Sequence, residues 1–298
     1  MNLFHKKDQY QGYNIYSMKK YVDKKRIIFT TIIVILIIIT LGFIIYYSVD
    51  TTIRLKSAKR FEQKLIEYES KQEELQKQER ERQAKIPKLT DEGKQNIKGI
   101  YKSETKRVFL TFDDGPSVNT ADVLDILKSN DIKATFFVLG TQVEKMPEMV
   151  KRAYQEGHYI ANHGYSHQYS QIYSSPETVL QEFNQCNSAV AKAIDVPEYN
   201  SHLFRFPGGS VGGKYANLKA EAVTLLEQNN IMHVDWNALT GDAEKSSPDE
   251  EYLMNNLQKT TQNKNSIVIL MHDAQAKRVT VEFLPKLIEF FQQQGYQF

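Results

Sequence analysis

The sequence predicts an α/β domain built on a parallel sheet, preceded by a membrane-length apolar helix and a charged helical stalk. Three observations support this prediction. Residues 27–47 form an uncharged run, residues 51–85 are rich in Lys, Glu, Gln and Arg, and from residue 101 onward short apolar runs alternate with helical patterns. Such alternation indicates a parallel sheet, because parallel strands need crossover connections that helices commonly supply. The sheet could be open or closed into a barrel.

Residues 27–47 are long enough to span a bilayer. At about 1.5 Å rise per residue they extend roughly 31 Å, close to the thickness of the hydrocarbon core. A cleavable signal peptide would have a shorter apolar region followed by small residues, whereas this run ends at Tyr46 and Tyr47. Because the run is apolar on every face, we expect an uncleaved signal anchor rather than a buried core helix.

Flanking positive charges predict the orientation of this anchor. Residues 1–26 carry seven Lys or Arg, and the twenty residues after Tyr47 carry five. Because the more positive flank stays inside, residues 1–26 are predicted to be cytoplasmic and the rest of the chain extracellular. The expected location is therefore the cell membrane, with a single crossing.

Residues 48–100 are predicted to form a helical stalk and a linker. The part over 51–85 contains no Gly or Pro and would extend about 50 Å as a helix. Five apolar residues fall at heptad spacing: Ala58, Phe61, Leu65, Tyr68 and Leu75. Gln72 and Glu79 interrupt this pattern. This favours a solvated single helix over a stable coiled coil and leaves weak self-association through the stalk open. Pro87, Gly93 and Gly99 indicate a linker.

Bulk composition restricts the function classes. The formal net charge of +2 gives no reason to expect a nucleic-acid partner. Cys186 is the only cysteine, so the chain has no internal disulfide, and this thiol is expected to be a small buried hydrophobe. The domain over residues 101–298 must therefore be stabilised by its core, which a domain of this length can supply.

Strands and helices are expected in alternation over residues 101–298. The strands are Val108–Phe112, Thr135–Val138, Tyr159–Asn162, His202–Arg205, Met232–Trp236 and Ser266–Met271. The helices are Asn119–Ser129, Val143–Gln155, Pro176–Ala193, Lys214–Asn229 and Val279–Gln294. Polar groups follow the C-terminal ends of these strands, and in a β/α barrel that edge carries the active site.

Two segments contain groups that suit a divalent metal. Asp113 and Asp114 end a strand before a Gly-Pro turn, which can bring both carboxylates into one cavity, one to bind a metal and one to act as a base. His163 and His167 are four residues apart, a spacing that places both on one face of a helical turn. Two histidines and a carboxylate leave open positions on a metal. Taken alone, Asp-Asp-Gly-Pro is a common turn.

Three further segments place polar groups after strands. Arg205 could clamp a carboxylate and hold it ionised. Asp235, Trp236 and Asn237 are followed by Asp242, and a final apolar strand ends at His272. Taken singly, a strand-terminal histidine or arginine is more often structural than catalytic.

Taken in order, these segments resemble the five motifs of the polysaccharide deacetylase family, also called the NodB-homology domain or carbohydrate esterase family four. The matching segments are Thr111–Pro116, His163–His167, Arg205–Ser210, Trp236–Asp242 and Leu270–His272. The resemblance covers residues 101–298. It implies a distorted, incomplete (β/α) barrel that holds one divalent metal and hydrolyses acetyl groups from a polysaccharide.

The resemblance also implies the metal ligands and the base. Asp114, His163 and His167 would be the ligands, and this set suits zinc, with cobalt or nickel able to substitute. Asp113 would be the general base and Arg205 its clamp. We expect Arg205 and the metal to keep the pKa of Asp113 low.

The implied acid and substrate contacts come from the later motifs. His272 would be the general acid and Asp242 the residue that orients it, so a bell-shaped pH profile is expected. The backbone N–H of Gly208 occupies the place that helps hold the oxyanion in relatives. Trp236 is expected to be a core residue or a wall of the substrate groove.

Three positions depart from the family pattern. Gly164 stands where Thr or Ser is usual, so a hydrogen bond that steadies the histidine loop is expected to be missing. Ala243 and Leu239 replace a frequent Trp and a frequent Asp. These changes affect substrate fit rather than chemistry. The last strand, near Phe298, is expected to be short or to be closed by another segment.

The predicted function is deacetylation of peptidoglycan at N-acetylglucosamine or N-acetylmuramic acid, because a membrane tether keeps the site near the wall glycan. One alternative is deacetylation of another polymer, such as chitin, poly-N-acetylglucosamine or O-acetylated xylan. A second is a non-catalytic, membrane-tethered glycan-binding protein, against which the complete set of base, acid and ligands argues. A third is a coiled-coil scaffold, in which the stalk would carry the function.

Overall fold

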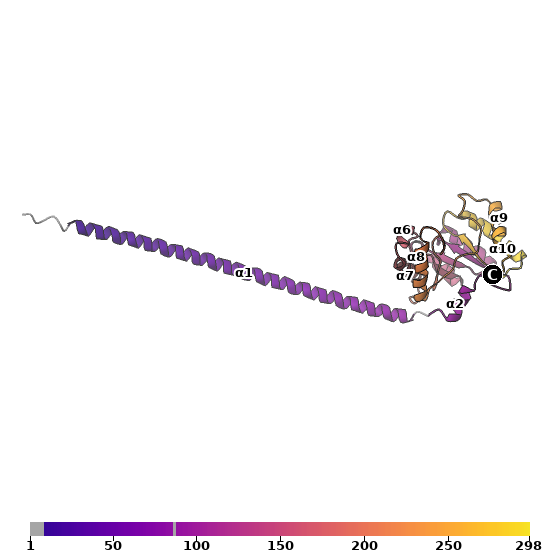
Figure 1. Ribbon diagram of the computed structural model, residues 1–298, viewed down its shortest axis with the longest axis horizontal. Coiled ribbons are helices and arrows are strands. Elements are labelled where there is room, and N and C mark those ends of the chain that lie inside the picture. The colour runs from indigo at the N-terminus through magenta and orange to yellow at the C-terminus, as the bar shows by residue number, and fades with distance from the viewer. Residues whose placement is uncertain (1–8, 86–87) are drawn as a thin grey trace, which may run out of the picture. The chain divides into compact units, whose positions relative to one another are not determined.

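The computed structural model describes residues 9–85 and 88–298 (Figure 1). The chain divides into two units, one ending at Arg80 and the other running from Glu81 to Phe298. Helix α1 (Gln9–Lys85) is continuous through both the apolar run and the charged segment. Within it, Arg26–Gln78 contains a stretch that is long and apolar enough to cross a membrane, a property that a signal sequence also has.

A short helix, α2 (Asp91–Lys98), occupies part of the expected linker. Thr90 caps it by accepting a hydrogen bond from the backbone N–H of Gly93 at 3.0 Å, and two acidic residues in its first turn favour the helix N-terminus. Gly93 therefore lies inside a helix, and Gly99 forms its C-cap. The sequence signals for this helix are weak, because a glycine near its start favours a turn.

The segment after α2 is attached to the base of the sheet. The guanidinium of Arg107 donates to the carbonyl oxygens of Lys102 at 2.9 Å and Ile100 at 3.3 Å. The hydroxyl of Ser266 donates to the same Ile100 carbonyl at 2.5 Å. The second unit therefore includes residues that precede residue 101.

The second unit is built on one seven-stranded parallel sheet, whose strands lie in the order β5-β4-β3-β2-β1-β7-β6. The strands are β1 (Arg107–Asp113), β2 (Thr135–Val138), β3 (Tyr159–Asn162), β4 (Leu203–Phe204), β5 (Met232–His233), β6 (Ala238–Leu239) and β7 (Ser266–His272). Residues 234–237 alone connect the two edge strands, β5 and β6, so these edges lie at most about 18 Å apart. The sheet is therefore curled into a half-barrel, which confirms the distorted, incomplete barrel.

The helices follow the predicted alternation with three differences. They are α3 (Val118–Ser129), α4 (Gly140–Lys145), α5 (Pro147–Gln155), α6 (Tyr169–Ile172), α7 (Pro176–Ala193), α8 (Ala216–Gln228), α9 (Glu250–Thr261) and α10 (Arg278–Gln293). Pro147 begins α5 and so divides one expected helix into two, because a helix rarely continues through the residue before proline. Helices α6 and α9 were not predicted from the sequence, although Asp249 caps α9.

The larger hydrophobic core packs the helices against one face of the central strands. Alternate residues of β1 (Val108, Leu110 and Phe112) are buried against the helices. Cys186 is fully buried, as expected of an unpaired thiol. At the C-terminus, Gln297 exchanges backbone hydrogen bonds with Lys106 and Val108, so a single bridge at the start of β1 replaces a longer last strand.

Candidate active site

A cavity of about 250 Å³ at the C-terminal ends of the strands collects most of the predicted site residues. Its lining includes Asp113, Asp114, His163, His167, Gly208, Trp236, Asp242 and His272. Arg205 is fully buried beneath it and contacts Asp113. The sheet register explains this convergence, because Asp113 and His272 are direct neighbours on β1 and β7.

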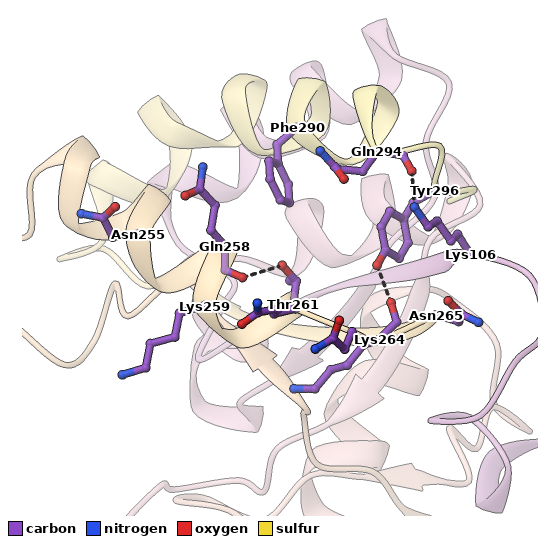
Figure 2. A pocket seen from close by; sticks show the side chains of 12 residues that line it. Lys106, Asn255, Gln258, Lys259, Thr261, Lys264, Asn265, Phe290, Gln294 and Tyr296 are labelled. Carbon is purple, nitrogen blue, oxygen red and sulfur yellow. Dashed lines mark hydrogen bonds between the residues drawn. The ribbon is translucent and has the colours of Figure 1, made fainter.

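A larger cavity, of about 940 Å³, lies near the N-terminal ends of β1 and β7 and contains none of the predicted residues (Figure 2). Amide and lysine side chains line it, with Phe290 and Tyr296 as its aromatic walls. Lys106 and Lys264 already donate to backbone carbonyls there. The smaller cavity, which combines carboxylates and histidines, is therefore the candidate active site.

Asp114, His163 and His167 form a set that could hold a metal ion. Their ligand atoms all lie within 4.8 Å of one another, and Oδ1 of Asp114 is 3.5 Å from Nε2 of His163 and 3.4 Å from Nε2 of His167. That carboxylate oxygen is buried and has no hydrogen-bond partner among the described residues. A buried carboxylate oxygen without a donor suits a cation, so the three residues fit a divalent metal.

The conformation of Asp114 separates the two adjacent carboxylates. Its φ of 71° lies in the left-handed region, which few residues other than glycine adopt. In an extended strand, neighbouring side chains point to opposite faces. The turn at Asp114 instead brings both carboxylates to the same cavity, as predicted from the Gly-Pro that follows.

The protein fixes the orientation of His163. Its Nδ1 lies 2.7 Å from the backbone carbonyl oxygen of Arg205. Because a carbonyl only accepts, Nδ1 must carry the proton, which leaves the lone pair of Nε2 facing Asp114. Burial lowers the pKa of His163 to about 3, so the ring is neutral, as a metal ligand must be.

Glu182, which was not predicted as a site residue, steadies the histidine loop. This carboxylate is buried and accepts from the backbone N–H groups of Tyr165 at 2.6 Å and Ser166 at 2.7 Å, and from the Ser166 hydroxyl at 2.8 Å. Gly164 adopts a φ of 89°, which few other residues adopt. The expected loss of a hydrogen bond at Gly164 is therefore offset. An acid on the apolar face of the predicted helix over 176–193 was the available signal.

Asp113 and Arg205 form a buried ion pair. Nη1 of Arg205 donates to Oδ1 of Asp113 at 2.8 Å and to the Thr111 hydroxyl at 2.7 Å. The rest of the guanidinium donates to the carbonyls of Val234 and Asp235, each at 3.0 Å. These contacts explain why the expected strand over 232–236 ends early, since its last carbonyls bind Arg205. They also hold the carboxylate in one position.

Burial in the protein raises the pKa of Asp113, and the attraction of Arg205 and His272 opposes this without outweighing it. The low pKa expected from the sequence also required the charge of a bound metal. The sequence could not indicate how deeply the carboxylate lies. A raised pKa suits a base, because a carboxylate with a pKa nearer neutrality is a better proton acceptor.

His272 and Asp242 form a second coupled pair. Nδ1 of His272 lies 3.0 Å from Oδ1 of Asp242, and its backbone N–H donates to Oδ2 at 2.8 Å. The Thr280 hydroxyl also donates to Oδ2, at 2.7 Å. Burial acts to lower the pKa of His272, but the hydrogen bond and charge of Asp242 raise it to about 9. Burial acts to raise the pKa of Asp242, and the contacts with His272 lower it.

The remaining walls of the cavity would contact a substrate. Trp236 lines it, as expected of a groove wall, and so do Leu239 and Ala243, two of the positions that depart from the family pattern. Tyr169 and Glu244 also line it and were not predicted. Tyr169 follows His167 closely in sequence, so its proximity to the predicted ligands was the available signal.

Comparison with known proteins places the chain in a family. Residues 101–225 match the polysaccharide deacetylase family. A putative polysaccharide deacetylase, YheN, from Bacillus subtilis is 36% identical over 198 residues, covering 65% of this chain and 66% of that protein. A peptidoglycan-N-acetylglucosamine deacetylase from Bacillus cereus is 33% identical over 200 residues, covering 65% of this chain and 69% of that protein.

Solved structures give the same result. A Streptococcus mutans CE4 esterase superposes with a TM-score of 0.62 at 30% identity, covering 68% of this chain and 89% of the other. The catalytic domain of a peptidoglycan N-acetylglucosamine deacetylase from Eubacterium rectale gives a TM-score of 0.61 at 31% identity, covering 66% of this chain and 89% of the other. The fold and the site thus define the class of hydrolytic carbohydrate deacetylases. Within that class, the chain belongs to the polysaccharide deacetylase family, carbohydrate esterase family four.

Proposed function

We propose that this protein removes N-acetyl groups from peptidoglycan by metal-dependent hydrolysis, at N-acetylglucosamine or N-acetylmuramic acid. The observation that carries the proposal is one cavity that joins a three-residue metal set, a buried Asp–Arg pair and a buried His–Asp pair. Relatives named as peptidoglycan-N-acetylglucosamine deacetylases support the choice of polymer. A relative named as a bifunctional xylanase/deacetylase keeps O-acetylated xylan as an alternative substrate.

Amide hydrolysis needs a stronger nucleophile than water and a more electrophilic carbonyl. Asp114, His163 and His167 would hold a divalent metal, which when bound would supply both by acidifying a water molecule and polarising a carbonyl oxygen. Among the protein groups, Asp113 takes the proton of the attacking water, and Arg205 keeps its carboxylate in place. The backbone N–H of Gly208 donates to the oxyanion.

Breakdown of the tetrahedral species requires a proton on nitrogen. The C–N bond breaks as His272 donates its proton to the leaving amine, so the products are acetate and a free amino sugar. Asp242 keeps His272 protonated and fixes its ring by the contact at Nδ1. His272 then regains a proton, and Asp113 loses the one it took from water. Both groups are thus restored for the next turnover.

The function is tested on peptidoglycan treated with a soluble fragment that starts at residue 88 and therefore includes α2. Mass spectrometry of the digested glycan should show sugars that have lost acetyl groups, and the fragmentation should identify which sugar. A chelator should abolish this loss, and zinc or cobalt should restore it. Chitin oligomers, poly-N-acetylglucosamine and acetylated xylan serve as competing substrates. If the metal-loaded enzyme deacetylates one of these polymers and leaves peptidoglycan unchanged, that polymer is the substrate instead.

We also propose that residues 27–47 anchor the protein in the cell membrane, with the catalytic unit outside. The continuous apolar part of α1 and the positive residues before it support this topology. Protease added to intact protoplasts should remove the catalytic unit and leave the N-terminal part with the membrane. A catalytic unit that stays protected until the membrane is lysed would contradict this topology.

A further inference from the structure

Tyr169 lines the cavity together with the three residues of the metal set. It begins α6, two residues after His167, and its ring packs edge-on against that histidine with 5.5 Å between centroids. The side chain is 42% exposed and lines the candidate active site. Within residues 88–298, no acceptor or donor binds its hydroxyl. A phenol that lines a reaction cavity without a protein partner can donate to a ligand.

The Tyr169 hydroxyl lies beside Gly208. A Cβ added to Gly208 would lie 2.7 Å from the Tyr169 oxygen, so the phenol occupies the space that a side chain at Gly208 would need. From standard bond lengths, the phenol oxygen is at most about 5 Å from the Gly208 nitrogen. Two donors at that separation can both reach one oxygen atom, since each hydrogen bond spans about 2.9 Å.

A buried neighbour holds the phenol and the Gly208 turn together. The Tyr173 hydroxyl donates to the carbonyl oxygen of Pro207 at 2.7 Å, and its ring packs edge-on against Tyr169 with 5.7 Å between centroids. Tyr173 is 3% exposed. Tyr173 therefore contacts both Pro207, which precedes Gly208, and the ring of Tyr169. These two contacts limit the movement of the Tyr169 hydroxyl relative to the Gly208 N–H.

We propose that the Tyr169 hydroxyl is a second protein donor to the acetyl oxygen, acting with the Gly208 N–H as that oxygen becomes an oxyanion. The hydroxyl donates a hydrogen bond and keeps its proton throughout the reaction. The inference rests on the proposed deacetylase function and deepens it. A donor that is already in place stabilises the developing charge at no cost in reorganisation.

The test compares Tyr169→Phe with the unchanged protein in its metal-loaded form. The substitution removes the hydroxyl and keeps the ring that packs on His167. Loss of one donor to an oxyanion lowers kcat by about 10²–10³-fold, and we expect a fall of that order with little change in KM and in bound metal. Tyr154→Phe, at a tyrosine of similar exposure (37%) on α5, is the matched control and should keep full activity.

A second substrate separates a donor from a merely structural side chain. The fluorine atoms of a trifluoroacetyl group withdraw electron density from the oxyanion, so it depends less on a hydrogen-bond donor. The loss in kcat for Tyr169→Phe should therefore be several-fold smaller on an N-trifluoroacetyl sugar than on the N-acetyl sugar. An equal loss on both substrates, or wild-type kcat in Tyr169→Phe, would overturn the role of Tyr169. An unchanged protein that deacetylates neither substrate in any metal would instead overturn the proposed function.

Discussion

Replacing Asp113 with asparagine is expected to lower the deacetylation rate by roughly 10²–10⁴-fold while the metal stays bound, because a general base contributes that much. Oδ2 of Asp113 is 3.8 Å from Nε2 of His163, whereas Oδ1 of Asp114 lies closer to both histidines. Asparagine keeps an oxygen that can accept from Arg205 but cannot take a proton from water. Single-turnover rates and metal content of the purified variant check this expectation.

Asp114→Asn is the matched variant. It should weaken metal binding, so excess zinc should restore part of the rate, which it should not do for Asp113→Asn. Both variants should fold, since Arg205 keeps its other acceptors, Thr111, Val234 and Asp235. Melting temperatures check this and exclude unfolding as the cause of lost activity. If Asp113→Asn loses metal while Asp114→Asn retains it, the two roles must be exchanged.

The alkaline limb of the pH profile is expected to lie near pH 9 and to move toward lower pH in Asp242→Asn. His272 must be protonated to act as the acid, and Asp242 raises its pKa to about 9 from an ordinary value of 6.5. The protonated form is therefore present below about pH 9 and is lost above it. Without the carboxylate, burial acts on His272 with less opposition, so its pKa and the limb both fall. kcat/KM measured against pH gives this shift.

Two further variants define the alkaline limb. Thr280→Val removes one hydrogen bond to Asp242 but keeps the carboxylate, so its limb should move much less than that of Asp242→Asn. His272→Ala should lose the limb along with most of the turnover and keep its metal. An alkaline limb that stays near pH 9 in Asp242→Asn would assign that limb to another group.

The sequence predicts the parts of the site that lie next to strand ends. In a parallel sheet all C-terminal ends meet at one edge, so Asp113, His163, Arg205 and His272 could be expected to converge from order alone. The two-residue strands β4, β5 and β6 were less predictable, because so few residues carry no clear period of alternation.

Features that depend on tertiary contacts could not be predicted from the sequence. Glu182 is 17 positions from Tyr165 and 16 from Ser166, the loop residues that donate to it, and only the packing of α7 brings them together. The direction of the pKa of Asp113 depends on burial, which no motif records. Tyr169 acquires its proposed role only because the Gly208 turn folds beneath its hydroxyl.

The attachment of residues 99–102 to Arg107 and Ser266 has a mechanical consequence for a tethered enzyme. These two residues begin β1 and β7, whose opposite ends carry Asp113 and His272. A tensile load on the chain before α2 would therefore enter the protein at the base of its two longest strands, about 20 Å from the reacting groups. If residues 27–47 anchor the protein as proposed, thermal forces on the chain before α2 would act at that base rather than on Asp113 and Asp114.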